Sequence, residues 1–246
     1  MKLSSLFALV LFAGIPICSQ SEAVAAPIGT VNYNSPTTAI FGGGNPNGSW
    51  TSATSGNTSV ELRFKERGTG VMTNDGAGTY SFPVGTFVNL EFSAGTGTQN
   101  FSEFKYLLSL DSDPTANTAL TTFDPLLLFS DNSWGNGGTA NGAGVEGLAS
   151  TYGSTSSLVQ NSERDIWFNF HPAGDALYQM SFSVYAFDDV NYSTPLARTE
   201  ANLQIGDGAS SVPDTGSTLL MFGFAGLGLM AVNKKSTGKK LNPAMA

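Results

Sequence analysis

The chain has 246 residues, 41% of them hydrophobic, and a formal net charge of −8, so it is long enough to bury one sizeable core. Between Ala26 and Ser211, seventeen acidic side chains stand against six basic ones, a balance of −11. Such a surface repels phosphate backbones, which argues against a nucleic-acid partner. The one cysteine, Cys18, lies within the first 25 residues, so the rest of the chain has neither a disulfide nor a thiolate.

The N-terminus has the layout of a secretory signal peptide. Lys2 precedes an apolar stretch from Leu6 to Ile17, and the small residues Ala23-Val24-Ala25 follow it. We expect a signal peptide over 1–25, with cleavage after Ala25 and export of the mature chain. The stretch is shorter than the ~20 residues of a spanning helix, which argues against a permanent anchor.

Residues 26–208 are predicted to form one all-β domain. From Tyr178 to Ala186, large apolar and small polar residues alternate with period two, as in a strand with one buried and one solvated face. The same alternation occurs at Val60, Leu62 and Phe64, at Val88, Leu90 and Phe92, at Phe104, Tyr106, Leu108 and Leu110, at Ile166, Phe168 and Phe170, and at Ala201, Leu203 and Ile205. Short strands separated by turn residues indicate an antiparallel β-sandwich or jelly roll.

Two further expectations concern this domain. In the strand around Leu62, the side chains of Glu61, Arg63 and Lys65 would lie on the solvated face. The stretch 132–157 is too rich in Gly, Ser and Thr for an assignment, and would form a long excursion at one end of the sandwich. The run at Ala201 to Ile205 would complete a final hairpin with the strand that starts at Tyr178.

The C-terminal segment, 209–240, combines a short motif, an apolar run and a basic tail. The motif over 212–218 reads V-P-D-T-G-S-T, and a membrane helix is expected over 217–232. Sixteen helical residues span about 24 Å, slightly less than a hydrocarbon core of ~30 Å. The basic tail over 233–240 would stop transfer on the cytoplasmic side through four lysines, namely Lys234, Lys235, Lys239 and Lys240. Length and charge alone also fit an ordinary tail anchor.

These residues resemble the sorting segment of bacterial PEP-CTERM proteins, in the variety whose motif reads V-P-D-S-G-S-T. The resemblance covers about thirty residues, with Thr215 in place of the usual Ser, and it implies recognition by exosortase, a membrane-embedded processing enzyme of Gram-negative bacteria that accompanies exopolysaccharide production. By position, the recognition residues would be Val212, Pro213, Asp214, Thr215 and Gly216. The resemblance implies processing rather than an activity of the β domain. The L-P-x-T-G signal of sortase-anchored proteins is the alternative, although its leucine is missing here.

Few residues of the β domain suggest a binding or catalytic site. His171 stands alone at a predicted strand end, without the Gly-x-Ser-x-Gly motif or second His of common hydrolases. Trp167 is a candidate for stacking on a glycan, or it packs beneath a loop. Asp111 and Asp113 offer alternate carboxylates that would suit Ca²⁺, or they cap a turn before Pro114 through backbone hydrogen bonds.

The sequence therefore predicts an exported, non-catalytic surface or extracellular-matrix protein. The exosortase-type enzyme would process it at the inner membrane, and exopolysaccharide would be its partner at the cell surface or in the matrix. A carbohydrate-binding module and a secreted glycan-active hydrolase are the alternatives, because two carboxylates at a set separation suffice for glycoside hydrolysis. Apart from the candidate Ca²⁺, no cofactor is expected.

Overall fold

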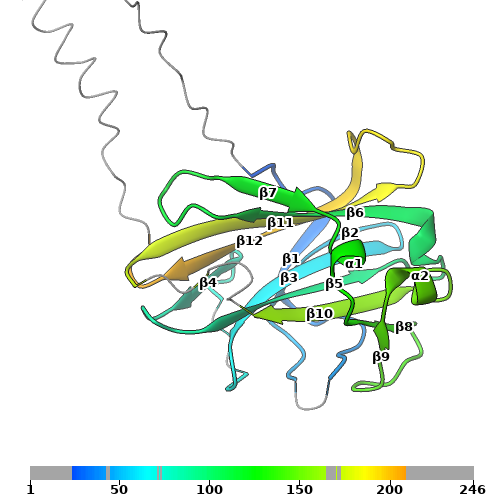
Figure 1. Ribbon diagram of the computed structural model, residues 1–246, viewed down its shortest axis with the longest axis horizontal. Helices are drawn as coiled ribbons and strands as arrows, with labels where there is room; N and C mark the ends of the chain where they lie inside the picture. Colours follow the sequence, from blue (N-terminus) through cyan, green and yellow to red (C-terminus); the bar gives the residue numbers. More distant parts are fainter. Residues whose placement is uncertain are drawn as a thin grey trace, which may run out of the picture.

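The computed structural model describes residues 24–42, 45–70, 72, 74–164, 170 and 173–208. Within this part of the chain, two β-sheets pack face to face and form an all-β sandwich (Figure 1). The seven-stranded sheet has the order β1 (Thr30–Ser35), β2 (Trp50–Ser55), β3 (Thr58–Glu66), β5 (Val88–Gly95), β10 (Leu158–Arg164), β8 (Asn132–Gly135) and β9 (Val145–Gly147). The five-stranded sheet has the order β4 (Thr79–Phe82), β12 (Pro195–Ile205), β11 (Ala176–Ala186), β6 (Phe104–Asp111) and β7 (Leu120–Phe123).

Strand pairing is antiparallel in the described part of the chain except between β4 and β12, which run parallel. The expectation of a purely antiparallel sandwich is therefore wrong at this one edge. The predicted final hairpin is confirmed, because β11 and β12 pair over nearly their whole length, with Met180 opposite Ala201. β2 and β3 also form a hairpin, whose two-residue connection starts at Gly56 with a positive φ of 58°, as tight hairpin turns require.

The hydrophobic core lies between the two sheets, and period-two alternation explains its composition. Phe92 of β5 packs against Phe182 of β11, with their ring centroids 5.6 Å apart. This contact links the central strands of the two sheets. Phe64 of β3 packs edge-on against Tyr80 of β4 at 5.5 Å and also contacts the ring of Phe170. All five rings are buried, and edge-to-face aromatic pairs add to the stabilisation from area burial.

The outer face of the seven-stranded sheet differs from the sequence-based expectation. Glu61, Arg63 and Lys65 of β3 point away from the core, yet their relative exposures are only 5%, 1% and 8%. A segment made of residues 36–42 and 45–49, here called the covering segment, lies on this face and accepts hydrogen bonds from Arg63 and Lys65. The prediction of a solvated face is therefore wrong for β3, because a long connection between β1 and β2 excludes water from it.

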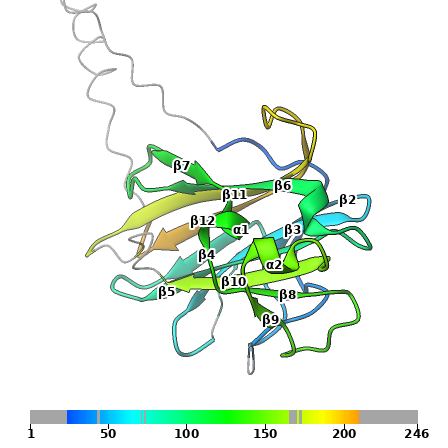
Figure 2. The ribbon, with the colours of Figure 1, turned by 45° about the vertical axis from the view of Figure 1, so that its right-hand side comes forward.

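The stretch 132–157 also differs from the expectation of a long excursion. It contains β8 and β9, which extend the seven-stranded sheet beyond β10, and the short helix α2 (Ala149–Tyr152) (Figure 2). The other short helices are η1 (Phe101–Glu103) and α1 (Pro125–Leu128). Sequence patterns do not predict these strands, because they are three or four residues long and are defined by the pairing of β8 with β10 and of β9 with β8.

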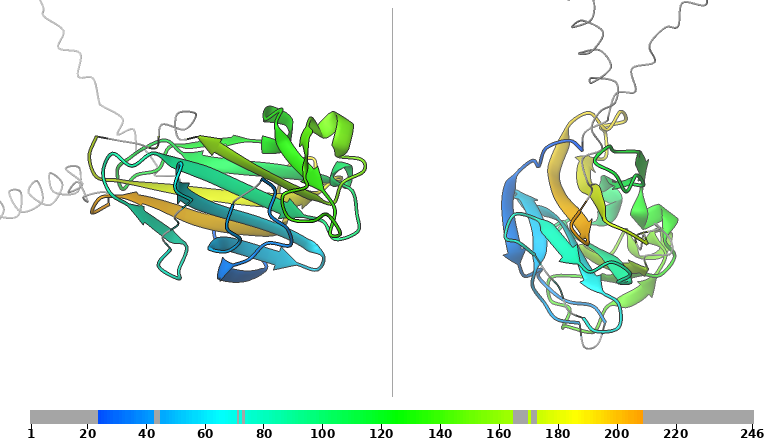
Figure 3. Two further views of the ribbon diagram at one scale, coloured as in Figure 1. Left: turned by 90° about the horizontal axis from the view of Figure 1, so that it is seen from below. Right: turned by 90° about the vertical axis from the view of Figure 1, so that its left-hand side faces the viewer.

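The described chain ends at one end of the sandwich, and the short helices lie towards the other (Figure 1). β12 runs from the β11–β12 loop to Ile205, so the last described residue, Gly208, lies at the end opposite α1 and α2 (Figures 1 and 3). No helix within the described ranges is long and apolar enough to cross a membrane. The predicted signal peptide and C-terminal membrane helix lie outside the described residues.

Candidate functional site

A buried group of three charges occupies the outer face of the seven-stranded sheet. The antiparallel register places Arg63 of β3 directly opposite Glu91 of β5. Arg63 Nε lies 2.5 Å from Glu91 Oε2, and Lys65 Nζ lies 2.6 Å from Glu91 Oε1. A buried carboxylate is tolerable only when cations or hydrogen-bond donors compensate it, and here two cations hold one carboxylate.

The covering segment completes the bonding of this group. Arg63 Nη1 donates to the carbonyl oxygens of Pro46 and Gly48 at 2.8 and 2.9 Å. Lys65 Nζ donates to Asn45 Oδ1 at 2.5 Å. Both cations therefore have partners within the molecule, and the covering segment is fixed to the sheet through them.

Gln160 of β10 fixes the other half of the covering segment. The Phe41 amide donates to Gln160 Oε1 at 2.9 Å, and Gln160 Nε2 donates to the Ala39 carbonyl oxygen. Phe41 also packs with Ala39 and Leu158 in a small apolar cluster on this face. The segment is therefore held by one amide, two cations and an apolar contact, rather than lying loosely over the sheet.

Beside these contacts, a polar cavity of about 330 Å³ opens between the covering segment and the β8–β9 hairpin. Its lining includes the buried residues Trp50, Arg63, Glu91 and Gln160, together with the exposed carboxylates Asp131 and Glu146. Asp131 precedes β8 and accepts a hydrogen bond from Asn161 Nδ2 at 3.2 Å. The polar cavity thus has a buried, internally bonded floor and an acidic rim.

Trp50 connects the floor of the cavity to the buried charges. The Arg63 guanidinium lies 4.1 Å from the centroid of the Trp50 ring, a cation–π contact in a desolvated position. Trp50 is 1% exposed, and its indole Nε1 has no hydrogen-bond acceptor in the described part of the chain. A buried tryptophan N–H usually has a hydrogen-bond acceptor, so this donor is an exception.

Glu61 lies on the same outer face, between Ser52 of β2 and Ser93 of β5. Burial raises the pKa of its carboxyl from 4.5 to about 7, while hydrogen bonds from Ser59 and Ser93 oppose this shift. Its Oε2 has no hydrogen-bond partner among the described residues. Glu61 is therefore a buried carboxyl that changes charge near neutral pH.

A second, aromatic cavity of about 410 Å³ lies at the end of the sandwich that carries α1 and α2. Its lining includes Tyr106 and Trp134 from the core, and Phe187 and Tyr192 from the β11–β12 loop. Burial raises the pKa of Tyr106 well above its usual range, and its hydroxyl has no partner within the described ranges. Lys105 Nζ lies 5.5 Å from the ring centroid of Phe187 and 5.4 Å from that of Tyr192.

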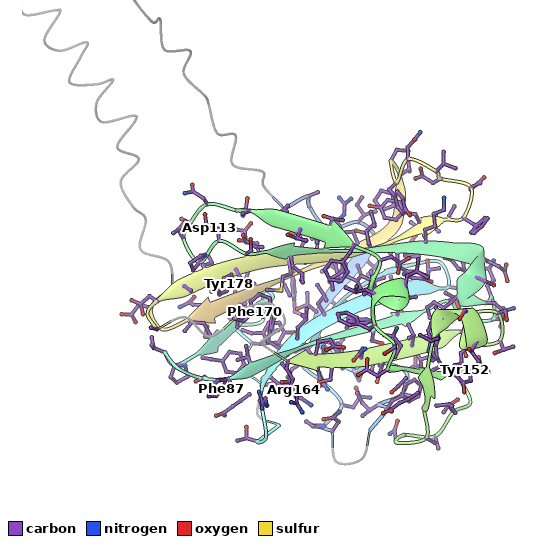
Figure 4. All side chains as sticks on the ribbon, in the orientation of Figure 1. Phe87, Asp113, Tyr152, Arg164, Phe170 and Tyr178 are labelled. Atoms are coloured by element: carbon purple, nitrogen blue, oxygen red, sulfur yellow. The ribbon has the colours of Figure 1, made fainter. Side chains whose placement is uncertain are left out.

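Asp111 and Asp113 form a hydrogen-bonded turn after β6. Asp111 Oδ1 accepts from the amides of Asp113 and Ala119 at 2.9 and 2.8 Å, and Asp113 Oδ1 accepts from the Thr115 amide at 2.9 Å. Their charges also raise the pKa of Tyr178, after the larger effect of its burial. Asp113 lies at the opposite end of the molecule from Tyr152 of α2 (Figure 4). These bonds are those of the turn-capping alternative, and binding of Ca²⁺ at this pair stays a prediction.

The remaining residues singled out in the sequence lie outside the described residues. These are Trp167, His171, the motif residues from Val212 to Gly216, and the lysines of the basic tail. Their predicted roles in glycan contact, sorting and stop-transfer stay predictions.

Of the other tryptophans, Trp134 is a core residue that packs edge-on against Phe101, whereas Trp50 lines the polar cavity. Sequence reasoning missed Arg63 and Glu91, although two cations in one apolar strand of a cation-poor domain were a usable signal.

Comparison with known proteins identifies the C-terminal segment. The family described as VPDSG-CTERM motif matches residues 211–236. The chain therefore carries a PEP-CTERM-type exosortase sorting signal, as the V-P-D-T-G-S-T motif predicts. This signal implies an exported protein that an exosortase-type membrane enzyme processes.

The β domain has weaker likenesses. No curated protein sequence matches the chain. Among solved structures with some similarity is a family 123 glycoside hydrolase from Clostridium perfringens, studied for glycolipid glycan hydrolysis, with 11% identity and a TM-score of 0.25. The match covers 59% of this chain and 27% of that chain. At this TM-score, the likeness bears on neither the fold nor the activity of the β domain.

Proposed function

We propose that this protein is a non-catalytic component of the cell surface or extracellular matrix, which acts beside exopolysaccharide after an exosortase-type enzyme has processed it. The observation that carries the proposal is the sorting signal over residues 211–236, which begins three residues after Gly208. The signal peptide would direct export. The C-terminal helix and its lysines would hold the chain in the inner membrane until processing.

The position of the sorting signal supports this order of events. β12 ends at Ile205 and already pairs with β11 on one side and β4 on the other. A domain whose last strand is paired on both sides can fold before its C-terminal segment is processed. Pro213 lacks an amide hydrogen and has a fixed φ, which favours an extended segment that a peptidase can bind.

The processing step is tested by intact-mass measurement in a host with and without its exosortase gene. With the enzyme, we expect a surface or matrix form that lacks Lys240. Without it, we expect a membrane-bound form that keeps the basic tail. Asp214→Ala should reduce processing, whereas Ser210→Ala, just outside the matched residues, should not. A released form that still contains Lys240 would contradict the proposal, and processing by a sortase instead would support the L-P-x-T-G alternative.

The partner and the absence of catalysis are tested separately. The protein should co-sediment with exopolysaccharide from a producing strain and stay soluble in the extract of a strain that makes none. Incubation with that exopolysaccharide should release no new reducing ends. Release of reducing ends by the purified protein would assign it to the glycan-active hydrolases instead.

A further inference from the structure

Two polar side chains in the floor of the polar cavity, Arg63 and Gln160, already form hydrogen bonds within the molecule. Arg63 Nε and Nη1 donate to Glu91, Pro46 and Gly48, and both ends of the Gln160 amide are used by the covering segment. The buried cation is therefore neutralised and is not a free anion site. Whatever binds here must be recognised by the groups that remain.

The remaining groups at the rim are mainly acceptors. Asp131 and Glu146 are exposed, and neither forms an ion pair with any residue in the described ranges. Asp131 Oδ1 accepts one hydrogen bond from Asn161, which leaves further lone pairs available. An ionised carboxylate forms short, strong bonds with hydroxyl donors. The rim therefore favours a ligand that offers O–H or N–H groups.

The floor adds one donor. Trp50 is 1% exposed and lines the cavity, and its Nε1 has no acceptor within the described part of the chain. This observation is independent of the acidic rim, because it indicates a missing acceptor rather than a missing donor. A hydroxyl group both donates and accepts hydrogen bonds. A ligand with several hydroxyls would satisfy the rim and the floor together.

Charge and size exclude other ligand classes. The carboxylates of Asp131 and Glu146, which form no ion pair within the described ranges, would repel an anion, and a hydrocarbon would leave the polar lining unsatisfied. The described residues contain no group of three or more His, Cys, Asp or Glu side chains that could hold a metal ion. The volume of about 330 Å³ lies at the small end of the range for small-molecule sites, about 300–1,000 Å³.

We propose that the polar cavity binds one uncharged saccharide residue, with Asp131 and Glu146 accepting hydrogen bonds from its hydroxyls and Trp50 Nε1 donating to it. This inference deepens the proposed function, since it names the site through which the protein would contact exopolysaccharide. The cavity faces away from the five-stranded sheet, because its floor residues alternate with the core residues Leu62, Phe92 and Val159. β12, which leads to the sorting signal, belongs to that other sheet, so the site stays clear of the strand nearest the membrane.

The proposal is tested by calorimetric titration of the processed protein purified from its exporting host. The probes are neutral oligosaccharides released from the host's own exopolysaccharide and neutral tetrasaccharides of glucose, mannose, galactose and N-acetylglucosamine. Tetragalacturonate serves as the anionic probe, and calcium chloride and putrescine serve as the cationic probes. We expect binding of at least one neutral probe, with a change in tryptophan fluorescence, and no binding of tetragalacturonate.

The variants are chosen at the rim, where folding is least at risk. Asp131→Asn and Glu146→Gln should each weaken the binding of the neutral probe about tenfold or more, because each removes the charge from an acceptor. Asp188→Asn, an exposed aspartate in the β11–β12 loop, is the matched control and should leave binding unchanged. Trp50→Phe keeps the aromatic ring but removes the N–H, and it should weaken binding and abolish the fluorescence change.

Three results would overturn the proposal: no binding of any neutral probe, binding that the double variant Asp131→Asn with Glu146→Gln leaves intact, or binding only of the charged probes. The outcome is independent of the sorting experiments. If the protein binds a neutral probe but is not processed by exosortase, the proposed function is wrong and the proposed binding site stands. If the protein is processed and its association with the matrix survives the double variant, only the proposed binding site is wrong.

Discussion

At the scale of single residues, the unusual feature is a set of ionisable groups on a sheet face that water does not reach. Glu61, Arg63, Lys65 and Glu91 are each less than 9% exposed, although they point away from the core. Arg63, Lys65 and Glu91 form ion pairs, whereas Glu61 forms no ion pair with any cation in the described part of the chain. Paired and unpaired charges in one environment should respond differently to substitution.

Glu61 should make the stability of the protein depend on pH. Its pKa is about 7 in the folded protein and 4.5 for an ordinary Glu carboxyl, so the folded state keeps a proton that the unfolded chain releases between these values. The free energy of unfolding should therefore fall as pH rises from about 4.5 to about 7, and stay low above that. Glu61→Gln, which cannot ionise, should be more stable than the wild type by up to about 3 kcal/mol at pH 8 and by nearly nothing at pH 4. Urea unfolding at pH 4, 6 and 8 measures this difference, and an equal difference at all three values would show that Glu61 does not titrate as described.

Substitution of Glu91 should destabilise the protein, which is the opposite of the effect expected for Glu61→Gln. Glu91→Gln leaves the buried cations of Arg63 and Lys65 without a counter-charge, and breaking a buried ion pair on one side costs about 3–5 kcal/mol. The exposed Glu146→Gln, the same chemical change at the cavity rim, should alter stability by less than about 0.5 kcal/mol. Guanidinium unfolding of both variants at pH 7 provides the comparison. If the two variants unfold alike, the three buried charges do not act as a unit.

At the scale of elements, five strands predicted from alternation are present, namely β3, β5, β6, β11 and β12, and each has a strongly apolar inner face. The predicted strand at Ile166, Phe168 and Phe170 lies outside the described residues except for Phe170, and it stays a prediction. β2 could not be predicted, because its sequence WTSATS has small polar residues on both faces and gains its burial from neighbours. β8 and β9 are too short to show a period, and β9 pairs only with β8. Their positions depend on contacts between distant segments, which local sequence does not encode.

The contact between the β8–β9 loop and the covering segment can be tested at a glycine. A methyl group added at Gly144 would lie 2.5 Å from Phe41 Cγ, so the ring would have to move. Gly144→Ala should therefore destabilise the protein by about 1–3 kcal/mol, as overpacking does elsewhere. At Gly137 in the same connection, an added Cβ meets nothing within 4 Å, and Gly137→Ala should be within about 0.5 kcal/mol of the wild type. Thermal unfolding measures the stability of both variants. If Gly144→Ala leaves the stability unchanged, Phe41 is not fixed where the covering segment meets the loop.

At the scale of the whole molecule, the sorting signal could be predicted from the sequence, whereas the polar cavity could not. The sorting signal is a contiguous motif, so Val212 to Thr218 identify it without any structure, and the match over 211–236 confirms it. The polar cavity joins Trp50, Arg63, Glu91, Asp131 and Glu146, which lie on five separate segments. Only the pairing of β3, β5, β10 and β8, together with the covering segment, brings them into one place, so no pattern in the chain could have indicated it.

The independence of the β domain from its sorting segment is the last expectation. The buried core cluster extends from Ala53 to Ile205, and β12 pairs with β11 over nearly its whole length and with β4 from Asn202 to Ile205, so the domain's own strands already cover its core. The precursor, purified in detergent from a host without exosortase, and the processed protein in the same detergent should therefore unfold at temperatures within about 2 °C of each other, since 1 kcal/mol shifts the midpoint of a domain of this size by about 2–4 °C. Glu91→Gln should lower both midpoints equally, which shows that the measurement reports on the sandwich. A precursor that is stabilised by much more than this would mean that its C-terminal segment packs against the β domain, and a segment buried in that way could not be presented to a membrane enzyme.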